Sequence, residues 1–180
     1  MKKLYLLRHG QTEFNVKKLV QGRCDSPLTD LGRKQAGMAA AWLKSHDVVP
    51  DKVVSSPLGR AMDTAQLVAC ELLGPDAAAE PCEGIIERCY GTFEEGPHDA
   101  LPTDVWDPGE DLVPFGGEGS RALQERMVGT LTNLMDSEDT ETFLAVSHGS
   151  ASRQFIKLQP QRLRAPSKTP QLRHHDLRFR

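Results

Sequence analysis

An arginine and a histidine stand side by side near the amino terminus, directly after a short apolar run. Residues 4–7 are Leu-Tyr-Leu-Leu, and Arg8, His9 and Gly10 follow. If the run is a strand of an open α/β sheet, these residues lie at the edge where such sheets bind ligands. Arginine matches the oxygen geometry of phosphate, and neutral imidazole is a nucleophile near pH 7. The triplet therefore predicts phosphoryl transfer through a phosphohistidine, although a strand end followed by a turn would give the same three residues.

Three later segments contain residue types that this chemistry needs. Residues 55–65 read SSPLGRAMDTA and include Arg60. Residues 87–96 read ERCYGTFEEG and begin with Glu87. Residues 146–149 read VSHG and contain His148. A second guanidinium, a carboxylate and a second imidazole could stabilise charge and move protons in phosphoryl transfer.

Together with Arg-His-Gly, and in this order, these segments resemble the histidine phosphatase superfamily, also called the phosphoglycerate mutase-like family. The resemblance runs from about Lys2 to about Ile156. It implies that His9 attacks phosphorus while Arg8 and Arg60 hold the phosphoryl oxygens. It also implies that His148 donates to a phosphoryl oxygen.

The resemblance selects Glu87 as the general acid and then the general base. Glu83, Glu94 and Glu95 lie nearby and compete for the role. Glu87 is selected because, in the family pattern, the catalytic glutamate precedes a Gly-x-Phe/Trp-Glu-Gly element. The bound phosphoryl group would favour the protonated carboxyl that an acid needs.

The resemblance extends to residues that would bind phosphate or substrate around these five. They are Gly10, Thr12, Asn15, Gln21, Gly22 and Gly149. The stretch 116–120, GGEGS, resembles a Gly-Glu-Ser element with one extra glycine. No metal is implied, since arginines and histidines supply the charge that a divalent ion would otherwise bring.

Hydrophobic patterns predict the elements that must position these residues. We expect strands at 3–8, 52–55 and 142–147, and a short strand within 80–87 that delivers Glu87. We expect helices from Thr29 or Asp30 to 45, at 59–73, from 118–120 onward and at 150–157. This alternation predicts an α/β fold of three layers, with a mainly parallel central sheet and helices on both faces. The glycine- and proline-containing residues 94–117 are expected to form a lid-like insertion.

Composition is consistent with one soluble domain. The chain has 180 residues, of which 38% are hydrophobic and 26% charged, and no apolar run approaches the ~20 residues of a membrane span. The first residues do not resemble a secretory signal, so we expect a cytoplasmic protein. The four cysteines lack Cys-x-x-Cys spacing and are expected to be free thiols.

The resemblance divides the chain into a histidine phosphatase domain at 1–156 and an atypical basic tail at 157–180. The tail has seven Lys or Arg and one Asp, a local charge of +6, so residues 1–156 carry −9 of the total of −3. Our hypothesis is a frameshift near residues 157–160. Back-translation of 171–180 with chosen codons, shifted by one base, reads NCAIMIFDF, which restores the turn and strand of the family. A frameshifted tail would leave an unpaired sheet edge and favour self-association, such as a homodimer.

Three functions remain open at this point. The first is a phosphatase that hydrolyses a small phosphorylated metabolite and needs no cofactor. The second is a phosphoglycerate mutase, which would require 2,3-bisphosphoglycerate, and the third is an impaired, non-catalytic binding protein. The basic tail is a weak sign of nucleic-acid binding because aromatic residues other than Phe179 are missing from it, and no membrane partner is expected.

Overall fold

A computed structural model describes residues 2–137, 140–158, 163–164 and 175–178 of the chain. Its centre is a sheet with the strand order β3-β2-β4-β1-β6-β5. The strands are β1 (Lys3–Arg8), β2 (Lys52–Ser55), β3 (Glu80–Pro81), β4 (Thr142–Ser147), β5 (Leu163–Arg164) and β6 (His175–Arg178). The first four strands in this order pair in parallel, while β6 is antiparallel to β1 and to β5. The predicted mainly parallel sheet is confirmed.

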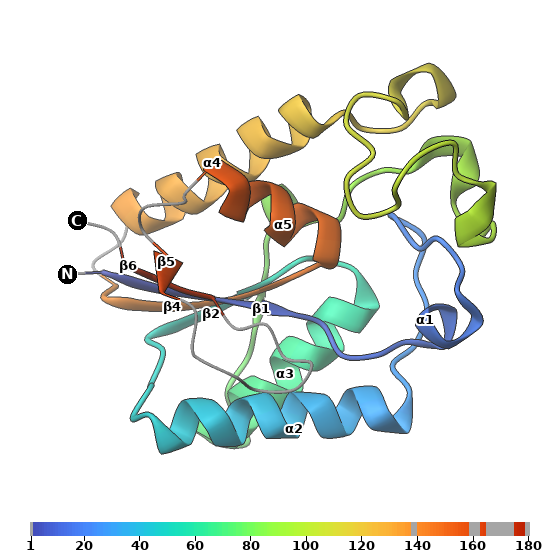
Figure 1. The fold of residues 1–180 in the computed structure, drawn as a ribbon. Helices are drawn as coiled ribbons and strands as arrows, with labels where there is room; N and C mark the ends of the chain where they lie inside the picture. Colours follow the sequence, from blue (N-terminus) through green and yellow to red (C-terminus); the bar gives the residue numbers. More distant parts are fainter. Residues whose placement is uncertain (1, 138–139, 159–162, 165–174, 179–180) are drawn as a thin grey trace.

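Helices cover both faces of this sheet, so the predicted three layers are confirmed as well. In Figure 1, α2 (Asp30–Ser45) and α3 (Gly59–Leu73) lie below the sheet, and α4 (Ser120–Ser137) and α5 (Gly149–Leu158) lie above it. The short helix α1 (Glu13–Lys17) lies beyond the sheet, in the loop after β1.

Alternation along the strands explains the two faces. Leu7, Val53, Leu144 and Val146 pack with the small residues of α2 and α3, whereas the neighbouring strand residues pack with α4 and α5. The second group consists of Leu4, Leu6, Val54, Phe143 and Ala145. Both faces are therefore dry, which is the usual condition for a parallel sheet.

Local sequence sets the helix boundaries near the site. The Thr29 side chain caps α2 by accepting from the Gly32 N–H, and Thr12 caps α1 reciprocally with Asn15. Helix α3 starts just after Pro57 and ends just before Gly74, as predicted.

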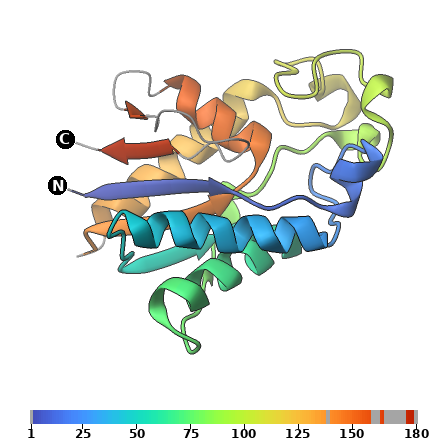
Figure 2. The ribbon, with the colours of Figure 1, turned by 60° about the horizontal axis from the view of Figure 1, so that its bottom comes forward.

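The strand register aligns the ends of β1, β2 and β4, so the loops that follow them meet at one edge, as Figures 1 and 2 show.

The short strand predicted within residues 80–87 is confirmed as β3, where Glu80 and Pro81 pair with β2. Cys82 still donates its backbone N–H to the Ser55 carbonyl at 2.7 Å, and a 3-10 turn, Glu83–Ile85, follows. The strand therefore ends well before Glu87 and does not deliver it directly.

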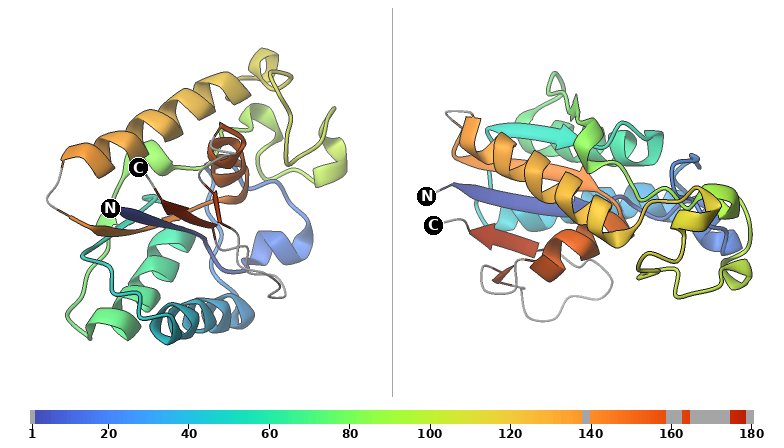
Figure 3. Two further views of the ribbon diagram at one scale, coloured as in Figure 1. Left: turned by 60° about the vertical axis from the view of Figure 1, so that its left-hand side comes forward. Right: turned by 90° about the horizontal axis from the view of Figure 1, so that it is seen from above.

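The unpaired sheet edge expected after Ile156 is also not observed. In Figure 3, β6 lies beside β1, and the register pairs Leu6 with His175 and Lys3 with Arg178. The argument from that edge to self-association therefore loses its basis. Of the tail at 157–180, residues 159–162, 165–174 and 179–180 lie outside the described residues. Within the described part of the chain, no helix is both long and apolar enough to cross a membrane.

Candidate active site

His9 follows the last residue of β1 and points into a cavity at the carboxyl edge of the sheet. Its backbone N–H donates to the Ser147 carbonyl of β4 at 3.0 Å. Its ring Nδ1 lies 2.7 Å from the Gly10 carbonyl oxygen. A carbonyl only accepts hydrogen bonds, so Nδ1 carries the proton and Nε2 of the neutral ring keeps its lone pair. Burial, followed by the charges of Arg8 and Arg60, holds the pKa of His9 well below its usual value, so the ring is neutral at pH 7.

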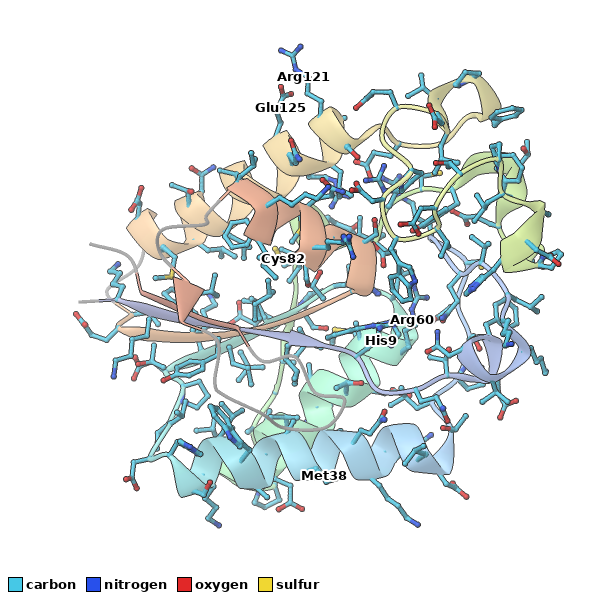
Figure 4. All side chains as sticks on the ribbon, viewed as in Figure 1. His9, Met38, Arg60, Cys82, Arg121 and Glu125 are labelled. Carbon is cyan, nitrogen blue, oxygen red and sulfur yellow. The ribbon has the colours of Figure 1, made fainter. Side chains whose placement is uncertain are left out.

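Two guanidiniums line the same cavity from different elements. Figure 4 shows Arg60, from the first turn of α3, close to His9. The Arg60 side chain is 1% exposed, and the loop before α2 holds it by Gly22 O and Cys24 O, each at 2.7 Å, and by Asp25 Oδ1 at 3.1 Å. Its Nε is buried without a hydrogen-bond partner among the described residues, and is left to bind an anion.

Arg8 is the more exposed of the two and is held by stacking. Its guanidinium carbon lies 5.1 Å from the ring centre of Trp106, which belongs to the segment 94–117. Gly149 lies against both groups, since a Cβ there would be 2.8 Å from the Trp106 ring and 3.4 Å from Arg8. Glycine at 149 therefore gives the arginine and the indole their space.

His148 follows β4 and lies behind His9. The two ring centres are 5.1 Å apart, with 60° between the planes. The Nε2 of His148 is 2.7 Å from Ser56 Oγ, and its buried Nδ1 has no partner among the described residues. Burial first, and then the neighbouring His9 and Arg60, keep the pKa of His148 well below its usual value, so this ring is also neutral.

Glu87 reaches the cavity from the segment that follows Glu83–Ile85. Its Oε1 accepts the N–H groups of Arg88 at 2.8 Å and Ala151 at 2.9 Å. Its Oε2 accepts a longer contact from Ser150 N, at 3.2 Å, and no other within the described part of the chain. The first turn of α5 thus holds both oxygens, and Oε2, with a single donor, keeps a lone pair for proton transfer.

The cavity, of about 420 Å³ including its opening to solvent, joins these groups to the lid-like segment. Arg8, His9, Arg60 and Glu87 form its polar end. The other walls are mainly apolar or neutral and consist of Asn15, Leu19, Val20, Gln21, Gly22, Tyr90, His98, Val105, Trp106 and Ser150. The segment 94–117 contributes His98, Val105 and Trp106, and so covers the cavity as a lid would.

The six additional residues from the sequence fall into three groups. Asn15, Gln21 and Gly22 line the cavity. Thr12 lies behind them, where its hydroxyl donates to Gln21 Oε1 at 2.9 Å. Gly10 and Gly149 permit close packing, since a Cβ at Gly10 would lie 2.3 Å from the Gly32 carbonyl oxygen.

The competing glutamates lie elsewhere. Glu94 accepts the backbone N–H groups of Arg23, Cys24 and Tyr90, and so ties the loop before α2 to the lid. Glu83 and Glu95 are exposed. Of the four candidates, only Glu87 lines the cavity.

Sequence reasoning assigned no role to Ser56, Arg88, Ser150 or Trp106. Ser56 and Arg88 bind side chains 92 and 62 residues away, so nothing in their own segments announces these contacts. A large aromatic residue inside a polar, lid-like segment was the available signal for Trp106.

Comparison with known proteins gives a consistent assignment. Residues 4–174 match the family model described as histidine phosphatase superfamily (branch 1), which extends beyond Ile156, where the sequence resemblance was expected to end. A probable phosphoglycerate mutase GpmB of Cronobacter sakazakii is 33% identical over 159 residues, covering 84% of this chain and 71% of the relative. A broad-specificity phosphatase of Saccharomyces cerevisiae is 31% identical over 158 residues, covering 86% and 69%.

Solved structures agree with these relatives. A mutant phosphoserine phosphatase of Entamoeba histolytica, in complex with phosphoserine, superposes with a TM-score of 0.73 at 31% identity, covering 89% of this chain and 81% of that one. A mycobacterial glucosyl-3-phosphoglycerate phosphatase gives a TM-score of 0.76 at 27% identity, covering 89% and 83%.

Proposed function

This chain belongs to the histidine phosphatase superfamily (branch 1), and from that premise we propose that it hydrolyses small phosphomonoesters through a phosphohistidine on His9. One observation carries the proposal. The contact of His9 Nδ1 with the Gly10 carbonyl gives a neutral ring whose Nε2 is nucleophilic, in a cavity that Arg8 and Arg60 also line. A nucleophile beside two cations suits an anionic electrophile such as a phosphoryl group.

In the first step, the Nε2 lone pair forms a bond to phosphorus as the bond to the leaving oxygen breaks. Glu87 gives its proton to that oxygen, so an alcohol departs. Arg8, Arg60 Nε and His148 Nδ1 neutralise the charge on the other phosphoryl oxygens.

In the second step, water attacks the phosphohistidine. Glu87 takes a proton from the water, the phosphorus–nitrogen bond breaks, and His9 regains its lone pair as inorganic phosphate leaves. No metal or organic cofactor enters either step. Asn15, Gln21 and Gly22 contact the substrate beside the phosphate, with Thr12, Gly10 and Gly149 supporting them.

The leaving group faces the lid. Leu19, Val20, Tyr90, Val105 and Trp106 give this part of the cavity apolar walls. These walls favour phosphorylated metabolites whose leaving group offers an apolar or neutral surface. The names of the phosphatase relatives, one of them of broad specificity, support hydrolysis of such esters.

The second candidate is a phosphoglycerate mutase, favoured by the name of the GpmB relatives. A mutase would use the same phosphohistidine but return the group to its substrate, and would need 2,3-bisphosphoglycerate. Supplying 3-phosphoglycerate with that compound separates the two, because a mutase forms 2-phosphoglycerate and a phosphatase releases inorganic phosphate.

The test of the main proposal is turnover of 4-nitrophenyl phosphate, together with rapid quenching to trap a phosphorylated histidine. We expect His9→Ala to remove both the turnover and the label. His46→Ala is the matched control, since His46 is an exposed histidine stacked on Trp42 at the end of α2. Turnover by His9→Ala would refute the role given to His9. A folded wild-type protein that does not hydrolyse 4-nitrophenyl phosphate would refute the proposal and favour a binding role.

A further inference from the structure

Arg88 is a fully buried arginine directly after Glu87, and the steps above do not use it. Its side chain is 0% exposed. Its Nε donates to Ser150 Oγ at 3.0 Å, and its Nη2 donates to Ser120 Oγ at 2.9 Å. Its Nη1 donates to the carbonyls of Gly109 at 3.2 Å and Glu118 at 2.7 Å.

None of these side-chain contacts is a carboxylate. A buried cation whose direct partners are neutral oxygens is costly, and burial lowers the pKa of Arg88. The nearby carboxylates of Glu87, Glu118 and Asp107 act in the opposite direction without outweighing burial. Packing alone could be served by an apolar side chain at lower cost. Such a cost is expected where a site needs the arginine for its geometry.

The contacts of Arg88 converge on Glu87 from two sides. The Arg88 backbone N–H donates to Glu87 Oε1 at 2.8 Å. The Arg88 side chain holds the hydroxyl of Ser150, whose backbone N–H is the only donor to Glu87 Oε2 among the residues that the structure describes. The oxygen proposed to move the proton is therefore placed by Ser150, and Ser150 is placed by Arg88.

The other donors of Arg88 anchor it to the segment that closes over the cavity. Gly109, Glu118 and Ser120 lie where this segment returns to α4. Arg88 thereby connects three parts of the chain: the segment that contains Glu87, the start of α5 and the end of the lid.

We propose that Arg88 is a positioning residue that, through Ser150, orients the Glu87 carboxylate for proton transfer to the leaving group. This inference rests on the proposed function, in which Glu87 is the general acid. If Arg88 acts in this way, its replacement should slow only the step in which Glu87 protonates the leaving group. A merely structural role would slow all substrates alike.

The test compares kcat/KM for two esters of similar size. This constant reports the steps up to loss of the leaving group. Benzyl phosphate expels an alkoxide that needs a proton, whereas 4-nitrophenyl phosphate expels a stabilised phenolate that needs little help. We expect Arg88→Gln to lower kcat/KM for benzyl phosphate by about tenfold or more relative to 4-nitrophenyl phosphate, a part of the full contribution of a general acid. Ser150→Ala keeps Arg88 and should shift the ratio in the same direction by a smaller factor.

Arg126→Gln is the matched control. Arg126 is a partly buried arginine that binds Glu118 and the carbonyls of Gly84 and Ile86, with no recorded bond to Ser150 or Glu87. It should lower stability without changing the ratio of the two esters.

Each outcome is decisive. An equal loss on both esters in Arg88→Gln and Ser150→Ala makes Arg88 structural and overturns the inference, while the proposed function stands. If Arg88→Gln does not fold, Ser150→Ala and Arg88→Lys decide by the same ratio. If Glu87→Gln itself fails to discriminate between the esters, the role given to Glu87 is wrong.

Discussion

Removing the hydroxyl of Ser56 should separate the stability of this site from its chemistry. Ser56 and His148 are both fully buried, and Ser56 Oγ lies 2.7 Å from His148 Nε2. If the hydroxyl donates to Nε2, the neutral ring carries its proton on Nδ1, which has no other partner among the described residues and can bind a phosphoryl oxygen. Ser56→Ala removes this constraint and leaves both ring nitrogens unpaired.

The magnitude follows from the burial of both groups. An unsatisfied buried polar atom costs about 1–3 kcal/mol in unfolding free energy. For a chain of this size, that cost lowers Tm by roughly 2–12 °C. A hydrogen bond contributes about 0.5–1.5 kcal/mol net, and here that energy favours the tautomer with its proton on Nδ1. Losing this preference should lower kcat/KM by roughly 2- to 13-fold.

The assay is kcat/KM for 4-nitrophenyl phosphate beside thermal melting, with nitrogen-15 shifts of the His148 ring to report its tautomer. Ser55→Ala is the control, because Ser55 is equally buried and its Oγ donates to the Ser56 carbonyl at 3.0 Å without touching His148. It should lose stability and keep its rate. The reasoning is refuted if both variants lose rate equally, or if the His148 tautomer is the same in Ser56→Ala as in the wild type.

Three other expectations concern pH, the lid and the loop before α2. Burial lowers the pKa of His9 and His148 in the folded protein, so the unfolded state binds more protons below about pH 6.5. The free energy of unfolding should therefore be highest above that pH and decrease as the pH falls below it. Urea unfolding at about pH 7.5 and about pH 5.5 measures the drop, which His148→Gln should reduce; equal stabilities would contradict it. Trp106→Ala should raise KM for aryl phosphates roughly 2- to 5-fold by loosening Arg8, while Phe115→Ala, an exposed lid aromatic outside the cavity lining, should not; equal KM changes would rule out the stacking role. Gly22→Ala should cost roughly 1–3 kcal/mol, because φ is +55° and a Cβ would lie 2.2 Å from Glu94 Oε1, whereas Gly37→Ala meets open space in α2 and should be neutral or stabilising; melting curves decide between them.

The sequence predicted those parts of the fold that depend on local signals. The boundaries of α3 follow from Pro57 before it and Gly74 after it, and β1 and β4 are short runs of buried apolar residues. Because both strands are parallel neighbours and Arg8 pairs with Ser147, His9 and His148 lie side by side at the ends of β1 and β4.

Contacts between distant segments could not be predicted in this way. Arg60 is held by carbonyls of residues 22–25, and Arg88 is held by residues of the lid and of α4. Both sets of hydrogen bonds depend on how distant loops pack against each other, which no local sequence pattern predicts. The short strand expected within 80–87 is β3, but the turn that follows it and leads to Glu87 was not predicted. The strand that pairs with β1 on its outer side, β6, lies in the tail that was expected to leave this edge unpaired.

A third small hydrophobic cluster joins the lid to the segments beside it. Leu101, Val105 and Leu112 of the lid pack with Val20, Tyr90 and Phe93, apart from the two clusters that flank the sheet. His9, Arg60 and His148, by contrast, belong to the sheet strands' ends and to α3. Exchange of the lid should therefore change the choice of ester while these three residues keep their places. A chimera that carries a relative's residues in place of 94–117 should take on the relative's selectivity and keep this chain's nucleophile, provided that an aromatic residue at the place of Trp106 still holds Arg8.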